Sequence, residues 1–196
     1  MREHRDVTDR TTPFDCDCGG VSGHLDVRPP HGATHLVCHC DDCLTAAVAM
    51  GQPYPGSAGV AVVQTTPDRV HIDKGADRLG ILRLSPRGLY RWYATCCGVP
   101  LFNTPPKRGV PYVALHAGRV ASPEDLGPVR AHVNAGAESR GLWRAIPGII
   151  ARTAAARLTG RWKETPFFDG DGSPVAAETV LTRAQRAAAA PKRPKG

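Results

Sequence analysis

The residues of this sequence best able to do chemistry are its seven cysteines, which fall into three short groups: Cys16 and Cys18, then Cys38, Cys40 and Cys43, then Cys96 and Cys97. An odd number of thiols cannot be fully paired in disulfides within one chain. The neighbouring residues include several aspartates and His39, which are typical of polar loops rather than of an inert core. Clustered reduced thiols at such spacings predict metal binding, most often of zinc.

The first and third groups can together complete one site. Cys16 and Cys18 are too close in sequence to form a comfortable disulfide, and Gly19-Gly20 after them predicts a turn whose backbone amides can point toward thiolates. Cys96 and Cys97, after a distant strand, are the available second pair. Four thiolates leave no open zinc position, which is typical of a structural site, and the binding energy of such a zinc is also folding energy.

The middle group (Cys38, Cys40 and Cys43) has three thiols, so one zinc position is left for water or substrate, as in catalytic sites. A zinc held in this way can bind an external thiol as thiolate or polarise an aldehyde oxygen. Three alternatives stay open. The group is a second structural site closed by His39, His24 or His35, or it is empty, or Cys40 and Cys43 form a C-x-x-C redox pair.

Three motifs contain these cysteines: D-C-D-C-G-G-V-S-G at 15–23, V-C-H-C-D-D-C at 37–43 and Y-A-T-C-C-G-V-P-L-F at 93–102. Together they resemble the pattern C-x-C-G, C-H-C-x-x-C and C-x-x-C-G of the glutathione-dependent formaldehyde-activating enzyme family, which also contains centromere-protein-V-like proteins. The resemblance covers about residues 14–117.

The resemblance implies a folded-over all-β arrangement called a β-tent, a structural zinc at the first and third motifs, and a labile zinc at the middle one. It also implies an activity that joins glutathione and formaldehyde into S-hydroxymethylglutathione. We therefore expect a mainly β, β-tent-like fold of zinc-bound sheets with a helical C-terminal extension. The expected function is that of a carbon–sulfur lyase or synthase acting on a glutathione–formaldehyde adduct, with a small thiol such as glutathione as partner.

Two other classes of function compete with this one. The first is a non-catalytic, zinc-stabilised binding module, and the second is a thiol redox or metal-handling protein. If glutathione binds, its two carboxylates require cationic donors, because guanidinium groups hold carboxylates in bidentate fashion. The candidate donors are four basic residues near the motifs, namely Arg83, Arg91, Lys107 and Arg108.

The third motif departs from the family pattern. Ala94 stands where the first cysteine of C-x-x-C-G is expected, and Cys96 is present instead. Adjacent residues on an extended strand point to opposite faces. Cys96 and Cys97 can therefore bind one zinc only through a bulge or turn. Otherwise the first site has three thiols and some other ligand.

The elements that must position these groups are mostly strands. Glycine and proline, 21 and 18 residues, make up about a fifth of the chain, which suits short strands joined by turns. Apolar–polar alternation and β-branched runs predict strands at 21–27, 60–63, 70–73, 81–84, 89–93, 101–102 and 112–115, and residues 34–37 lead into the second cysteine group. A helix is expected to begin near Asp41 and to run to Met50. These elements define a zinc-binding β domain at 14–135.

A helical, basic extension is expected at 138–190, followed by a disordered tail at 191–196. One helical face is apolar over 142–162, with Trp143, Ile146, Ile150 and Leu158 on it. Between Arg130 and Lys163 there are seven basic residues and one acidic residue. We expect the apolar face to cover the β layer while the arginines face solvent, as in most amphipathic helices. Neither a membrane nor a nucleic acid is then an expected partner.

Charge and hydropathy also exclude some classes of protein. The formal net charge is +7, and no apolar run approaches the ~20 residues of a transmembrane helix. The beginning of the chain, MREHRDVTDR, is charged and leads into no apolar segment, so no secretory signal is predicted. The expected location is the cytoplasm, where thiols stay reduced.

Overall fold

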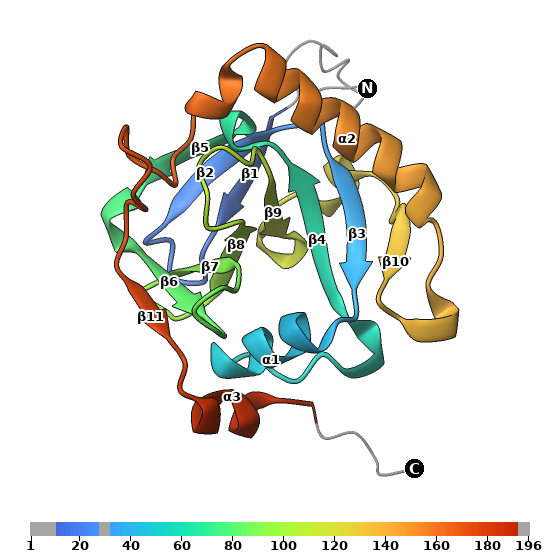
Figure 1. Ribbon diagram of the computed structural model, residues 1–196, viewed down its shortest axis with the longest axis vertical. Coiled ribbons are helices and arrows are strands. Elements are labelled where there is room, and N and C mark those ends of the chain that lie inside the picture. Colours follow the sequence, from blue (N-terminus) through green and yellow to red (C-terminus); the bar gives the residue numbers. More distant parts are fainter. Residues whose placement is uncertain (1–10, 28–31, 192–196) are drawn as a thin grey trace, which may run out of the picture.

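The computed structural model describes residues 11–27 and 32–191, and its strands form two sheets (Figure 1). The smaller sheet has the order β1-β2-β5, with β1 (Thr11–Asp15), β2 (Ser22–Asp26) and β5 (Val70–Lys74). The larger sheet has the order β10-β3-β4-β9-β8-β7-β6-β11. Its strands are, in chain order, β3 (Thr34–Cys38), β4 (Val60–Thr65), β6 (Leu79–Arg83), β7 (Tyr90–Ala94), β8 (Pro100–Thr104), β9 (Val113–His116), β10 (Ala131–Val133) and β11 (Glu178–Val180). The expected mainly β fold with C-terminal helices is confirmed.

The strands that the sequence predicted are those with apolar–polar alternation or a run of β-branched residues. The S-P-R-G segment forms the β6–β7 hairpin turn, in which the Gly88 amide donates to the Ser85 carbonyl at 2.9 Å. Four strands escaped prediction. The sequence predicted no strand at β1 or β3, and β10 and β11 are only three residues long and show no period. The last two are parallel edge strands, with β10 on β3 and β11 on β6. Residues 192–196 of the expected tail lie outside the described residues.

The main core lies between the two sheets and contains most of the large aromatic side chains. The Phe14 ring of the small sheet meets the Phe102 ring of the large sheet edge to face, with centroids 5.2 Å apart. Phe167, from the C-terminal segment, packs against both Phe102 and Trp92. All four side chains are buried. The C-terminal segment thus contributes to the same core, and the division at 135/138 stays a prediction.

Helix α1 (Asp41–Ala49) follows β3 directly, so the strand end and the helix start together position the middle cysteine group. The last helix, α3 (Arg183–Ala189), lies beside α1 (Figure 1), and Arg186 forms a 2.8 Å ion pair with Asp42. The run T-V-L-T-R-A-Q-R-A-A-A-A at 179–190 falls within the expected helical extension, but α3 covers only part of it. It is shorter because Glu178–Val180 pairs with β6 and Thr182 caps the helix, forming a capping box with Gln185.

Helix α2 (Leu142–Leu158) packs on β3, β4 and β10, but not through the face that the sequence predicted. Trp143, Ile150 and Leu158 are 71%, 61% and 87% exposed, and Ile146 is exposed too. The buried face consists instead of Ala145, Arg152 and Ala156. The expectation that the apolar stripe covers the β layer is therefore wrong.

The physical reason is that the surface below α2 is only partly apolar. Ala145 packs in the apolar cluster of β3, β4 and β10, whereas Arg152 lies over polar side chains. The Arg152 guanidinium donates to Thr34 Oγ1 at 2.6 Å and to Gln64 Oε1, and both of these side chains are buried. Small alanines let the helix approach closely enough for these bonds. Within the described ranges, none of the helices is both long and apolar enough to cross a membrane.

Candidate metal centres

The first cysteine pair lies on the tight turn between β1 and β2. The Cys16 amide donates to the Val21 carbonyl, and the Gly19 amide donates to the Cys16 carbonyl, each at 3.0 Å. The Val21 amide donates to the Cys16 sulfur at 3.2 Å. The turn thus directs a backbone amide at a thiol, as the Gly-Gly sequence predicted.

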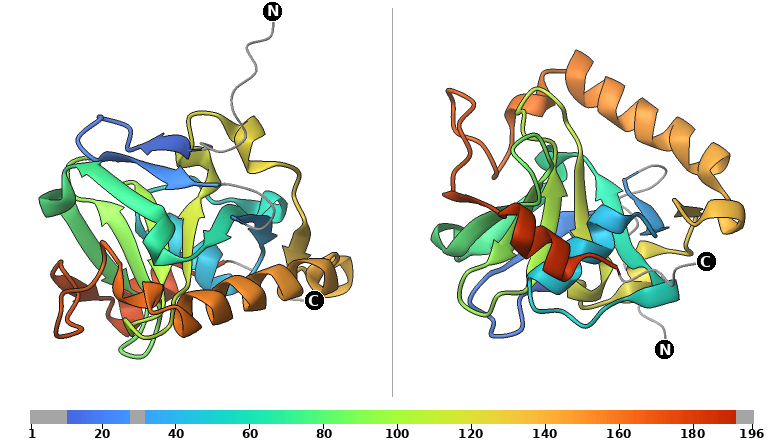
Figure 2. Two further views of the ribbon diagram at one scale, coloured as in Figure 1. Left: turned by 90° about the horizontal axis from the view of Figure 1, so that it is seen from above. Right: turned by 60° about the horizontal axis from the view of Figure 1, so that its bottom comes forward.

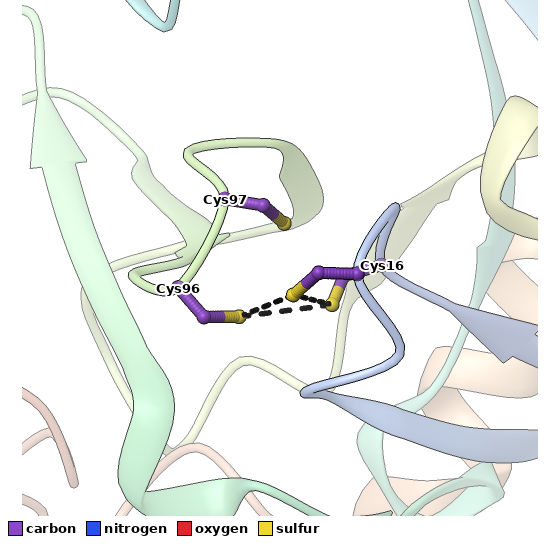
Figure 3. Close-up of side chains that lie close together, drawn as sticks. Cys16, Cys96 and Cys97 are labelled. Atoms are coloured by element: carbon purple, nitrogen blue, oxygen red, sulfur yellow. Dashed lines mark hydrogen bonds between the residues drawn. The ribbon is translucent and has the colours of Figure 1, made fainter.

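The third group resolves the problem of two adjacent cysteines. Strand β7 ends at Ala94, and the amides of Cys97 and Gly98 both bond back to the Ala94 carbonyl. Gly98 has φ of +76°, a left-handed conformation that suits glycine. Cys96 and Cys97 are therefore on a turn and not on an extended strand. Figure 3 shows both sulfurs directed toward the turn that carries Cys16.

The four sulfurs of Cys16, Cys18, Cys96 and Cys97 all lie within 4.8 Å of one another. The sulfur of Cys96 is 3.8 Å from that of Cys16 and 3.2 Å from that of Cys18. Two sulfurs on one tetrahedral zinc, each about 2.3 Å from it, would be about 3.8 Å apart. All seven cysteines lie in the described ranges, and all are free thiols. The spacing of the four sulfurs therefore suits a single zinc ion.

Gly20 has no side chain, and this lets the Cys96 and Cys18 sulfurs lie close to the turn. A Cβ atom at Gly20 would lie 2.8 Å from the Cys96 sulfur and 3.2 Å from that of Cys18. Burial raises the pKa of Cys16, but the Val21 amide and the neighbouring thiols outweigh it and lower that pKa to about 6. Hydrogen bonding to Cys18 raises the pKa of Cys96 to about 12. One thiolate thus opposes ionisation of the next, and a bound cation would remove that opposition.

The middle group is built around the start of α1. Cys38 ends β3, Cys40 is the N-cap residue of α1, and Cys43 lies in its first turn. The Cys40 sulfur accepts the Cys43 amide at 3.4 Å, and the Cys38 sulfur accepts Asn134 Nδ2 at 3.5 Å. The three sulfurs lie within 4.8 Å of one another. A helix N-terminus favours negative charge, so this position suits thiolates.

Hydrogen bonds among these thiols spread their pKa values apart. Hydrogen bonds with Cys40 and Cys43 lower the pKa of Cys38. Hydrogen bonds with Cys38 and Cys40 raise the pKa of Cys43. Burial, followed by the charges of Cys38 and Cys43, raises the pKa of Tyr112 to about 12. The charge of Cys38 thus opposes the ionisation of both Cys43 and Tyr112.

The histidines considered as a fourth ligand have other partners. His39 Nε2 faces His132 Nδ1 at 3.3 Å, His24 pairs with Asp73 at 2.9 Å, and His35 bonds to the Gly127 carbonyl at 3.1 Å. Within the described part of the chain, no histidine joins either thiol group. The middle group therefore remains a set of three thiols.

The buried Arg91 guanidinium interacts electrostatically with the middle group. The Arg91 side chain is 4% exposed, and its charge lowers the pKa of Cys43, against the larger effect of the neighbouring thiols. It donates to Asn103 Oδ1 at 3.2 Å, and Asn103 Nδ2 lies 3.4 Å from His116 Nε2. No salt bridge of Arg91 occurs among the residues that the structure describes. The thiols are thus an identified source of negative charge for Arg91.

Of the four basic residues proposed to hold carboxylates, Arg91 has an identified electrostatic interaction with the middle group. Arg83 pairs with Glu178 at 2.8 Å, Arg108 donates to the carbonyls of Lys163 and Gly170, and Lys107 is exposed. Sequence reasoning missed Asn103 and His116, the two residues that continue from Arg91 across β8 and β9. The available signal was a polar residue next to apolar ones in each of these short strands, Asn103 after Phe102 and His116 after Leu115.

A pocket of about 330 Å³ lies beside these elements, and His116, Arg119 and Tyr54 are among its lining residues. Its wall includes Ala47, one helical turn after Cys43, and Val60, which pairs with Cys38 in the sheet. Burial and the charges of Arg91 and Arg119 lower the pKa of His116 to about 4. This histidine is therefore neutral near pH 7.

No curated protein matches this chain. A crystal structure of a Rhodobacter sphaeroides protein is similar over 60% of this chain and 96% of the other, with 17% identity and a TM-score of 0.42. A family described as a family of unknown function, DUF6151, matches residues 8–178. The chain belongs to this family, DUF6151.

Proposed function

We propose that the protein binds two zinc ions, one structural and one exchangeable, and that the exchangeable site forms or breaks a carbon–sulfur bond between a small thiol and an aldehyde. The structural zinc belongs to Cys16, Cys18, Cys96 and Cys97. The exchangeable zinc belongs to the middle group. The observation that carries the proposal is the group of three sulfurs within 4.8 Å, with no fourth protein ligand in the described ranges.

The residues present fit zinc in both places. Thiolate sulfur is a preferred zinc donor, and the sulfur separations suit one small tetrahedral ion. Three thiolates and one Zn²⁺ carry a net charge of about −1. A buried charge is costly unless it is compensated, and Arg91 supplies the opposite charge. The same balance explains why an arginine without a carboxylate partner is tolerated in this interior.

The chemistry has a simple balance. The thiol sulfur adds to the carbonyl carbon, a C–S bond forms, the C=O double bond becomes a C–O single bond, and the thiol proton ends on that oxygen. When bound, zinc would lower the pKa of the thiol and polarise the carbonyl. This reaction is the one implied by the motif resemblance to the formaldehyde-activating family, with glutathione as the thiol.

The chain's own residues would bind and orient the thiol. Because Asn103 Oδ1 accepts from Arg91, its Nδ2 donates to His116 Nε2, and the His116 proton then lies on Nδ1. Neutral His116 and cationic Arg119 line the pocket beside the middle group, and Arg119 also pairs with the exposed Asp17. They provide a donor and a positive charge for the oxygens of a carboxylate-bearing thiol. The pocket volume lies in the range of small-molecule sites.

A non-catalytic, zinc-stabilised binding module is the second candidate. The observation that favours it is the exposed apolar face of α2, since a continuous apolar surface commonly marks a site of interaction. In that case the middle group stabilises the start of α1 and no substrate turns over.

The test compares the parent with Cys40→Ser at equal total zinc, since free zinc alone could speed the addition. Exchange NMR follows adduct formation between glutathione and formaldehyde. The proposal predicts faster exchange with the parent and glutathione-induced shifts that weaken in Arg119→Gln. Lys107→Gln, on an exposed side chain, is the matched control and should behave like the parent. Equal rates for the parent and Cys40→Ser, with no shifts in the parent, would favour the non-catalytic module.

A further inference from the structure

The outward face of α2 is a regular apolar stripe. We call Trp143, Pro147, Ile150, Ala154 and Leu158 the outer stripe. Successive members are three or four residues apart, which places them on one face of a helix. All of them are exposed. Figure 2 shows α2 along the outer edge of the molecule, with one long side away from the sheets. Single exposed apolar residues are ordinary, but a continuous stripe of this kind marks an interaction surface.

Positive charge gathers at the beginning of the same helix. We call Arg130, Arg140 and Arg144 the arginine cluster. They line a pocket of about 450 Å³ together with His132 and Trp143. Arg130 and Arg144 also line a second pocket of about 310 Å³, which Arg152 borders. None of the salt bridges among the described residues involves the arginine cluster. The cluster is therefore available to an anion from outside.

The charge pattern indicates what covers the stripe. No acidic residue occurs from 139 to 163, and Arg144 and Arg157 flank the outer stripe. Two copies packed through the stripe would bring these arginines together without a compensating acid, so a second copy is disfavoured. A protein partner that receives a helix usually offers a groove, which would also have to be acidic. A surface of anionic phospholipids provides both the negative charge and the apolar interior.

We propose that the outer stripe and the arginine cluster dock the protein on an anionic phospholipid surface. The phosphate groups bind the arginine cluster, and the stripe lies among the upper parts of the acyl chains, as in other interfacial helices. Trp143 suits this depth because its ring is amphipathic, and the Arg144 guanidinium lies 4.6 Å from its centroid. The expectation of no membrane partner depended on burial of this stripe, a premise that the structure contradicts.

The experiment measures co-sedimentation of the full-length, zinc-loaded protein with vesicles. One set is pure phosphatidylcholine, and the other contains about 30% phosphatidylglycerol to provide a negative surface. The expected result is binding to the anionic vesicles that weakens as salt is added, with little binding to the neutral ones. Tryptophan emission should shift to the blue on binding. Trp143→Phe should remove most of that shift, because Trp92 is buried and Trp162 is half-buried under basic side chains.

Two variants and a control separate the parts of the surface. Trp143→Glu with Ile150→Glu should abolish binding. Arg130→Ala with Arg144→Ala should weaken it roughly 30-fold, at about 1 kcal/mol per arginine near the surface. Leu89→Glu, an exposed apolar position on the β6–β7 hairpin, should bind like the parent. All altered side chains are exposed, and unchanged circular dichroism and zinc content would verify folding.

Several outcomes would overturn the proposal. They are absence of binding to anionic vesicles, binding that is unchanged in the Trp143→Glu, Ile150→Glu variant, or retention of inorganic phosphate by the arginine cluster without any vesicle binding. A dimer in light scattering that this variant disperses would also overturn it, and would assign the stripe to a second copy.

Discussion

At the residue scale, the two adjacent cysteines show what spacing alone can and cannot determine. The sequence identified all seven thiols and paired the first group with the third, because zinc needs ligands from separate segments. It left open whether Cys96 and Cys97 could both face one ion. The answer depends on the turn that closes on the Ala94 carbonyl, a backbone feature that no single residue type specifies.

Cys16 is the thiol whose loss should be most damaging, since its side chain is buried in the core and close to two other sulfurs. Cys16→Ser should lose one zinc equivalent and lower the melting temperature by more than about 10 °C, because structural zinc contributes directly to folding. Asp17→Ser is the matched control. It removes only a surface ion pair with Arg119, worth at most about 1 kcal/mol. Parental zinc content and melting in Cys16→Ser would refute the structural site.

His116 should make stability depend on pH. Burial and the charges of Arg91 and Arg119 lower its folded-state pKa to about 4, below the usual 6.5. The unfolded chain therefore takes up this proton first. The contribution is complete above about pH 6.5 and is lost as the pH falls toward 4, with a slope of at most about 1.4 kcal/mol per pH unit.

Urea unfolding at fixed total zinc measures this slope. His116→Gln should show a shallower decline than the parent between pH 6.5 and 4. His71→Gln, at an exposed position, should keep the parental decline. An unchanged slope in His116→Gln would show that other groups, such as the thiols, cause all of the acid sensitivity.

At the element scale, the position of helix α2 in the chain was predicted correctly, but the face that it buries was not. Its sequence carries a large apolar stripe and a second face of small residues interrupted by Arg152. Periodicity favours the larger stripe for burial. The structure buries the other face, because the strands below present Thr34 and Gln64 as buried acceptors for an arginine. The sequence of the helix alone does not determine which side chains the strands below present to it.

Arg152 should therefore be essential for the docking of α2. Arg152→Met removes the donor to two buried side chains and should cost about 2–4 kcal/mol of unfolding free energy, since unsatisfied buried polar groups are expensive. Zinc content should not change. Arg157→Met, at an exposed position on the same helix, should have little effect. Denaturant unfolding and metal analysis check both, and equal stability of the two variants would contradict the assigned role of Arg152.

At the scale of the whole molecule, the fold brings together segments that are far apart in the chain. Cys18 and Cys96 are separated by 78 positions, and Arg91, Asn103 and His116 align only because β7, β8 and β9 are neighbours in the sheet. The sequence named Arg91 as a candidate donor but could not connect it to the other two. Strand registers decide that connection, and these follow from packing across the whole sheet.

The proposed function requires that one chain hold two zinc ions in unequal sites. The direct measurement is zinc content per chain during titration with a mild chelator, with circular dichroism recorded at each step. We predict that about one equivalent leaves the open site without a change in fold, and that the second leaves only with unfolding. Cys40→Ser should start with the second equivalent alone. Release of both ions together with unfolding, or a folded chain that binds no zinc, would contradict the claim.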